Sequence, residues 1–206
     1  MTQNMTQKLK NNEFSVVIRI IDVGSIPSSS ARTTEAIVSV VFLYPKEVTM
    51  HQRTVSYSKS EQVHIVQPAD LNAGGRLFGG TLLKMIDELA AIVAMRHAGV
   101  KTVTTAAIDN LVFKSGAYVG DMIVLIGYIT HTGRTSMEVR VDTYVEKNDG
   151  MRYPINRAYM VLVAMDENNR PTTVPPIILE NEFQEEEYRL AEKRRALRLE
   201  RNKGGF

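Results

Sequence analysis

The chain has 206 residues, 44% hydrophobic and 23% charged, which suits one globular domain with additional tails. Twenty-five Lys and Arg against 23 Asp and Glu leave a net charge of +2, a balance that argues against a dedicated nucleic-acid binder. The lack of cysteine excludes a disulfide framework, a thiolate nucleophile and a Cys-ligated metal centre.

No targeting, membrane or metal-binding pattern is evident. The longest early apolar run, Ala36–Tyr44, is far shorter than the roughly 18 residues of a membrane span and has no basic segment just before it. The four histidines are scattered without the spacing of metal ligands: His51, His64, His97 and His131. We therefore expect a cytoplasmic protein with no membrane span and no metal.

Residues 1–49 differ in character from the rest of the chain. Two β-like runs, Phe14–Ile21 and Ala36–Tyr44, flank a loop rich in Ser, Pro and Thr, and the zone has no helical period or clear motif. We expect a poorly ordered, dispensable leader. Met50 is an alternative start, so the leader could also come from a start codon placed too early.

The next zone combines an extended segment, a loop and a long helix. Val55–Gln67 reads as extended and stops at Pro68, and Ala69–Gly75 has the composition of a turn. Phe78–Met95 contains no Pro and is apolar around most of its circumference, which predicts a long buried helix.

Four extended segments come after this helix: Thr102–Phe113, Met122–Thr130, Ser136–Glu146 and Tyr153–Met165. Their connections are too short to contain crossover helices, so the strands are expected to be antiparallel. A helix that is apolar on all sides needs cover from several directions. The predicted fold class is therefore α+β, with one curved antiparallel sheet wrapped around a central helix.

The charge pattern gives two further expectations, one for a strand of this sheet and one for the C-terminal segment. Ser136–Glu146 alternates apolar and polar residues, which predicts a half-buried strand with one face in water. Glu182–Asn202 has acidic residues first and basic residues last, as the helix dipole favours, with Glu185 and Arg189 as an i,i+4 pair. This segment is expected to be a solvated surface helix, with a docking role as the alternative.

Asp87 is the most informative polar residue of the long helix. On a helical wheel it lies about 100° from Glu88, away from the polar stripe and next to small and apolar residues. A carboxylate in such a place is costly unless it is paired or used. It is either a border residue paired with Lys84, or a general base or nucleophile.

Gly79, Gly80 and Asn72 precede Asp87 in the same region. The two glycines open the helix, where free N–H groups and the helix dipole could hold an oxyanion or a thioester carbonyl, or where close helix–strand packing requires them. Asn72 is either a turn former or an amide that donates to a carbonyl or orients a water.

Two adjoining strands meet at Gly133–Ser136, which is expected to form a hairpin turn. Arg134 could meet a phosphate and Ser136 a polar ligand, or the turn simply exposes its Arg. The chain contains no G-x-S-x-G, Walker A or G-x-G-x-x-G motif, which argues against a serine-triad hydrolase, an NTPase and a Rossmann cofactor site.

Several ordered blocks resemble one known family. The segment Pro68–Glu88 is similar to the signature of hotdog-fold acyl-CoA thioesterases, the acyl-CoA hydrolase type of bacteria and of vertebrate cytosol. Five further blocks agree with it: Arg96-His97, Val119–Asp121, Gly133–Val139, Val163–Asp166 and Val174–Pro176. The resemblance spans about residues 54–176, the expected hotdog domain, and leaves residues 177–206 as a charged C-terminal helix and tail.

The resemblance implies that two hotdogs pair into one continuous sheet with active sites at their interface. Asn72 of one subunit and Asp87 of the partner subunit would then complete each site. A chain with a single hotdog is expected to be at least a homodimer, and more fully a homohexamer built as a trimer of dimers. The block with Arg134, Thr135 and Ser136 resembles a CoA-contacting region.

The implied function is hydrolysis of acyl-CoA to a free fatty acid and CoA. Asp87 would act as base or nucleophile, Asn72 would orient water or the carbonyl, and the N–H groups of Gly79 and Gly80 would polarise that carbonyl. No cofactor is implied, since CoA is part of the substrate.

Three alternatives stay open. A non-catalytic acyl-CoA sensor would share the fold, although residues 1–49 show no helix-turn-helix output module. An acyl-thioester dehydratase would need a His base, and residues 70–90 contain none. A structural interaction protein would show no turnover.

Overall fold

The computed structural model describes residues 14–20, 39–45 and 51–204, the first two ranges and Asn110 by their backbone alone, and divides the chain into the units Met1–Thr49 and Met50–Phe206. In the first unit, strands β1 (Phe14–Ile20) and β2 (Ser39–Pro45) pair antiparallel. The two runs predicted as β-like are thus strands. The prediction of a poorly ordered, dispensable leader otherwise falls outside the described residues and stays a prediction.

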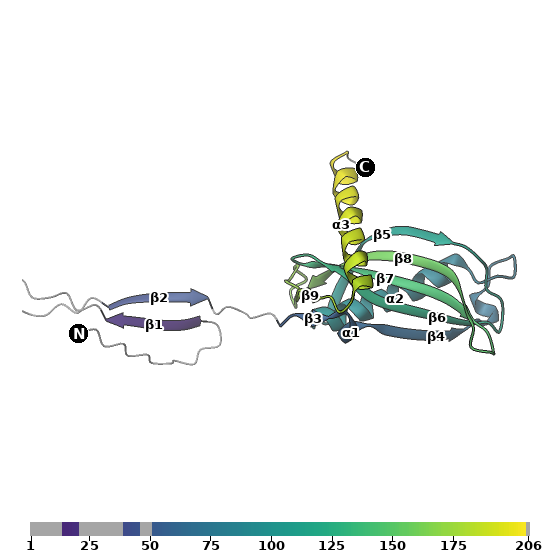
Figure 1. The fold of residues 1–206 in the computed structure, drawn as a ribbon, viewed down its shortest axis with the longest axis horizontal. Helices are drawn as coiled ribbons and strands as arrows, with labels where there is room; N and C mark the ends of the chain where they lie inside the picture. The colour runs from purple at the N-terminus through teal and green to yellow at the C-terminus, as the bar shows by residue number, and fades with distance from the viewer. Residues whose placement is uncertain (1–13, 21–38, 46–50, 205–206) are drawn as a thin grey trace, which may run out of the picture. The chain divides into compact units, whose positions relative to one another are not determined.

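The second unit is built on a five-stranded antiparallel sheet with the order β4-β6-β7-β8-β5 (Figure 1). The four strands predicted after the long helix are all present, with bounds that differ by at most two residues. Strands β4 and β5 form the two edges of the sheet. The strands are β4 (Ser60–Ile65), β5 (Thr102–Phe113), β6 (Met122–Thr132), β7 (Ser136–Glu146) and β8 (Arg152–Met165).

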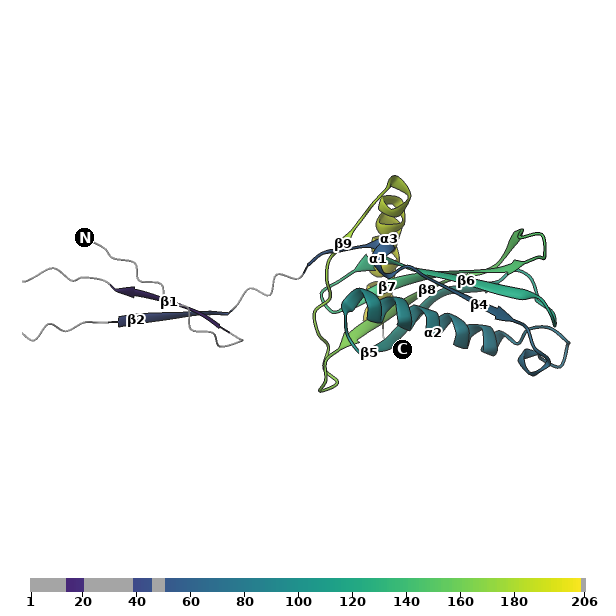
Figure 2. The same cartoon turned by 90° about the horizontal axis from the view of Figure 1, so that it is seen from below.

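Helix α2 (Gly79–Ala98) packs against one face of this sheet, and helix α3 (Glu182–Lys203) lies on the other (Figure 2). The side of α2 that faces the sheet is fully buried: Ile86, Ala90 and Val93 are all 0% exposed. The α+β architecture of a sheet around a central helix is therefore confirmed. The helix runs three residues further than predicted and ends at Gly99, whose φ of 71° suits glycine.

The helix approaches β6 closely at Gly127. A Cβ on this residue would lie 3.0 Å from Val93 and 3.2 Å from Leu89. Glycine in the middle of this strand therefore lets the long helix pack closely on the sheet.

The start of the unit differs from the extended segment predicted at Val55–Gln67. Val55–Ser58 is a helical turn, α1, because the Thr54 hydroxyl accepts a hydrogen bond from the Tyr57 N–H at 3.2 Å and caps it. Strands β3 (Arg53–Thr54) and β9 (Ile177–Ile178) form a short parallel ladder. Two-residue strands carry no periodicity, so the sequence did not predict them.

The expectation of a half-buried β7 was wrong. Its apolar face packs on α2 as predicted, but its polar face is covered too: Glu138 is 2%, Arg140 4% and Asp142 7% exposed. Helix α3 provides this cover. The expectation of a fully solvated C-terminal helix was also wrong, since Glu187 and Ala191 are buried against the sheet.

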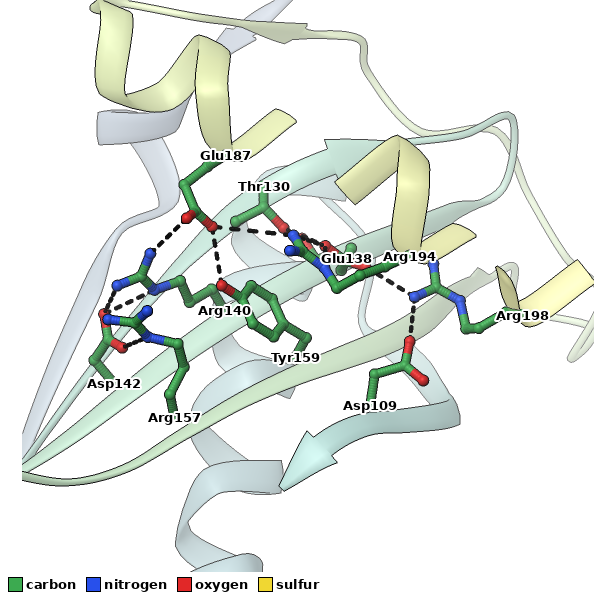
Figure 3. A network of polar contacts seen from close by, with 10 residues as sticks. All are labelled: Asp109, Thr130, Glu138, Arg140, Asp142, Arg157, Tyr159, Glu187, Arg194 and Arg198. Atoms are coloured by element: carbon green, nitrogen blue, oxygen red, sulfur yellow. Dashed lines mark hydrogen bonds and ion pairs between the residues drawn. The ribbon is translucent and has the colours of Figure 1, made fainter. Parts of the chain in front are cut away.

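Charge pairing explains why so polar a surface is buried (Figure 3). Glu138 accepts hydrogen bonds from Arg194 at 2.8 Å, Arg198 at 2.9 Å and Thr130 at 2.8 Å. Arg140 pairs with Asp142 at 2.7 Å and Glu187 at 2.9 Å. Buried charges are tolerated when each meets an opposite charge and hydrogen bonds.

The solvent side of α3 departs from prediction in one detail. Arg189 binds Glu186, three residues earlier, rather than Glu185. Both spacings bring side chains onto one face of a helix.

None of the helices in the described ranges is long and apolar enough to cross a membrane.

Candidate functional site

Asp87 on α2 is held by a residue that sequence reasoning missed. The Thr105 hydroxyl, on edge strand β5, donates a hydrogen bond to Asp87 Oδ1 at 2.6 Å. Asp87 is half-buried and Thr105 is exposed. The alternative pairing with Lys84 is not found, because Lys84 lies 3.7 Å from Glu88 instead. The carboxylate is therefore oriented by a neutral donor.

Gly79 and Gly80 form the first turn of α2, as predicted. Phe78 is the N-cap and gives no side-chain cap, and the N–H groups of both glycines meet no acceptor in the described part of the chain. A Cβ on Gly80 would lie 2.5 Å from the Phe78 ring, so any other residue there would require this exposed ring to shift. Free N–H groups at the positive end of a helix suit a carbonyl oxygen that gains negative charge.

Asn72 both shapes its loop and keeps a donor free. Its side-chain oxygen accepts from the N–H groups of Gly74 at 2.9 Å and Arg76 at 3.3 Å, which is the turn-forming role. A bridge between Leu71 and Leu77 closes the loop. The Asn72 amide nitrogen donates to nothing among the described residues, so it remains available to a ligand or a water.

One chain does not bring all these groups together. Gly79 and Asp87 are eight residues apart on a straight helix, which is about 12 Å. No hydrogen bond joins Asn72 to Asp87 in the ranges that the structure describes. A carbonyl touched by the helix N-terminus therefore lies too far from the Asp87 carboxylate of the same chain for direct attack.

The surface hollows agree with this. One, of about 650 Å³, lies between α3 and β5, and another, of about 520 Å³, lies between α2 and β4. Neither Asp87 nor Asn72 lines them. In the single chain Asn72 is exposed and Asp87 is half-buried.

Arg134, Thr135 and Ser136 form the predicted turn between β6 and β7. The Gly133 N–H donates to the Ser136 carbonyl at 2.7 Å, and the Thr135 carbonyl accepts from Ala164. Ser136 and Thr104 both pair with Val163, from opposite sides. With strands about 4.8 Å apart, the turn lies about 10 Å from the β5 residue next to Thr105.

Edge strand β5 is open and apolar on the side away from β8. In the described part of the chain β5 pairs with β8 alone. Ile108 is 41%, Val112 50% and Phe113 49% exposed, and Phe78 beside them is 54% exposed. A long apolar edge with unpaired backbone groups is a surface that pairs with another strand.

Metal ligands do not cluster among the residues that the structure describes. The described residues contain no group of three or more His, Asp or Glu that could hold a metal ion. The chemistry available is that of one oriented carboxylate, an amide and backbone N–H groups.

A long helix packed on a curved antiparallel sheet with this strand order is the hotdog fold of thioesterases. A family model described as "Thioesterase superfamily" matches residues 74–151. An uncharacterised acyl-CoA thioester hydrolase of Zymomonas mobilis is 39% identical over 114 residues, 55% of this chain and 76% of that protein. The chain belongs to the acyl-CoA thioester hydrolase family.

Other relatives and solved structures agree. The cytosolic acyl coenzyme A thioester hydrolase of Rattus norvegicus is 35% identical over 66% of this chain, but the match spans only 36% of that longer protein. An apo-hexameric acyl-CoA thioesterase is 40% identical with a TM-score of 0.70, covering 73% of this chain and 97% of that one. An acyl-CoA hydrolase of Staphylococcus aureus is 32% identical with a TM-score of 0.68, covering 75% and 96%, and binds butyryl coenzyme A and coenzyme A.

Proposed function

We propose that this protein hydrolyses acyl-CoA thioesters to a free fatty acid and CoA. The observation that carries the proposal is the Asp87 carboxylate, held at 2.6 Å by Thr105 on the open edge of the hotdog. The names of the relatives point to the same substrate class. The acyl-CoA bound by the Staphylococcus aureus protein supports a thioester as the group that reaches the carboxylate.

In this reaction the acyl carbon gains an oxygen and loses the CoA sulfur. As a base, Asp87 takes a proton from water, the hydroxide adds to the carbonyl carbon, and the leaving thiolate recovers a proton. As a nucleophile, Asp87 attacks the carbon itself, and water then cleaves the resulting anhydride. In both cases the N–H groups of Gly79 and Gly80 stabilise the charge on the carbonyl oxygen.

Each site takes groups from two chains in this proposal. The roughly 12 Å between Gly79 and Asp87 along one helix is too long for a single carbonyl. Pairing of two β5 edges would place Asn72, Gly79 and Gly80 of one chain against Asp87 of the partner subunit. The open edge of β5 supports such a homodimer. The hexameric state of the similar thioesterase supports further assembly into a trimer of dimers.

Two more features support the roles of individual residues. Solved variants of the Staphylococcus aureus hydrolase replace an Asn and an Asp that are 15 positions apart, which is also the separation of Asn72 and Asp87. The turn at Arg134, Thr135 and Ser136 lies at the end of the sheet that holds Thr105. We assign this turn to the CoA moiety, with Arg134 exposed and suited to a phosphate.

Release of free CoA thiol tests the function directly. The protein has no cysteine, so it adds no thiol signal of its own. The wild type is expected to turn over acyl-CoAs with a maximum at some chain length, and Asp87→Asn to lose about 10²–10⁴-fold in kcat. Asp87→Asn should keep the native mass and circular dichroism. Full activity in this variant would disprove the role of Asp87, and a folded wild type that binds acyl-CoA without turnover would indicate the sensor.

A further inference from the structure

We infer that the C-terminal end of α3 is a contact between two copies of this chain, and that the hollow beside it receives the same end of α3 from the second copy. The inference rests on the proposed function in one respect, the pairing of two chains through β5. It adds a second layer to that interface, on the face of the sheet opposite α2.

The course of α3 places its end outside its own sheet. The helix crosses the strands and continues past the edge formed by β5 (Figure 1). The crossing is marked by Asp109, near the middle of β5, which binds both Arg198 and Arg201 (Figure 3 shows the Arg198 contact). The last turns of α3 therefore lie at the β5 edge of the sheet.

A hollow of about 650 Å³ opens beside this end of the helix. It is lined by Asp109, Arg194, Leu197, Glu200 and Arg201. Leu197 is 58% exposed, although the helix around it is strongly charged. An exposed leucine in a hollow at an unpaired sheet edge is typical of a surface that another chain covers.

Symmetry favours a second copy as the occupant. A twofold axis beside β5 continues the sheet and brings the two α3 ends past each other, antiparallel, on the same face. Glu200 and Arg201 are neighbours that line the hollow with Leu197. Glu200 and Arg201 carry opposite charges, so two copies of this helix end that run antiparallel can complement each other in charge.

The ion pairs of Asp109 fit the same arrangement. Asp109 is only 8% exposed on the edge strand. Two β5 edges in register near their middles would bring two such carboxylates toward each other, which like charge opposes. Arg198 and Arg201 neutralise this charge. In this way α3 removes a repulsion that would oppose the pairing of two β5 edges.

The helix supplies a matched control. Leu199 is 50% exposed, two residues from Leu197, and two residues are about 200° of helical turn. It therefore lies on the opposite flank, the flank of Tyr188, whose ring stacks on His131 with centroids 4.8 Å apart. Leu199 does not line the hollow.

Subunit exchange tests the inference on the full chain. Unlabelled and isotope-labelled wild-type proteins are mixed, and native mass spectrometry follows the appearance of mixed oligomers. Leu197→Asp is expected to exchange at least about 10-fold faster than wild type, because it buries a charge at the contact. Leu199→Asp should stay within about twofold of wild type. Glu200→Arg should exchange faster, since it sets two cations against each other.

Equal exchange rates for Leu197→Asp and Leu199→Asp would overturn the inference, as would a wild type that is monomeric. Circular dichroism of each variant confirms that α3 is retained. CoA release by the same wild-type sample separates the two proposals. Exchange as expected without turnover refutes the hydrolase alone, whereas turnover with unchanged exchange in Leu197→Asp refutes the α3 contact alone.

Discussion

The carboxylate of Asp87 shows how far single residues can be understood from the sequence. Its place on the helical wheel singled it out, and the structure places it half-buried beside the open edge of the sheet. Thr105 could not be found in that way, because an exposed threonine in a strand has no spacing that marks it. Only the fold shows that its hydroxyl reaches Asp87.

The hydrogen bond from Thr105 to Asp87 predicts an effect on the rate of catalysis. Thr105→Ala removes the hydrogen bond that orients the carboxylate, and a hydrogen bond to a charge is worth about 1.5–3 kcal/mol. We expect kcat to fall about 10- to 100-fold with little change in KM. Steady-state kinetics of CoA release measure both constants. Thr105→Ser keeps the hydroxyl and should recover most of kcat; if it is as slow as Thr105→Ala, the hydroxyl is not the cause.

His97 predicts a pH dependence of stability. The ring is 0% exposed, with Nε2 donating to the Pro175 carbonyl at 3.2 Å and Nδ1 accepting from Ser58 at 3.4 Å. Burial lowers the pKa of His97 below its ordinary 6.5, and the charge of Arg53 adds to this, against the opposing effect of the Pro175 hydrogen bond. The unfolded chain therefore takes up a proton at a pH where the folded chain does not.

The sign follows from this difference. The contribution of His97 is complete above pH 6.5 and declines as pH falls from 6.5 toward the lowered folded pKa, below which it is constant. Urea unfolding at several pH values measures it. His131 also has a pKa lowered by burial, so the difference between wild type and His97→Gln isolates His97. Parallel stability curves for the two proteins would contradict the prediction.

Elements with a strong period were predictable, and short ones were not. Extended runs joined by short connections predicted the four long strands, with clear alternation in Ser136–Glu146, and an apolar pattern around most of the helix predicted α2. The helical turn α1 depends on the cap at Thr54, and β3 and β9 depend on each other across more than a hundred residues. No local pattern records such contacts. The burial of the polar face of β7 likewise depends on α3. The charge pattern of α3 predicts a solvent-exposed helix, and the sequence does not show that some of these charges pair with residues of the sheet.

The α3 network predicts a difference between buried and exposed ion pairs. Glu138→Ala leaves Arg194 and Arg198 without their shared carboxylate, and we expect a loss of about 3 kcal/mol in the free energy of unfolding. Glu186→Ala breaks only an exposed pair with Arg189 and should leave the urea midpoint unchanged. Urea unfolding compares the two variants. Equal effects would mean that α3 does not rely on buried pairing.

At the scale of the whole molecule, the question is how the residues of the proposed site come together. The sequence resemblance named Asn72, Gly79, Gly80 and Asp87 as members of one motif, yet about 12 Å of helix separates Gly79 from Asp87 in one chain. In the proposed site they meet only when a second copy is paired, and residues from two chains have no common order in one sequence. The catalytic roles proposed for these residues therefore apply to the paired protein.

Complementation tests the shared site. Asn72→Ala and Asp87→Asn are each expected to be nearly inactive. When the two are mixed and allowed to exchange subunits, half of the dimers are hybrids, and each hybrid has one site with both residues intact. Activity should return to about a quarter of wild type, since each chain supplies half of a twofold site. No recovery after proven exchange would place both residues in the same chain's site.

The short parallel ladder between β3 and β9 has a consequence for how this domain can be used. Arg53 lies opposite Ile177, so the segment that leads into the sheet lies beside the segment that leads from the sheet to α3. Sequence added before or after the domain need not thread through the sheet or separate its strands. A further domain joined before Arg53 therefore need not disturb the pairing of the strands in the hotdog.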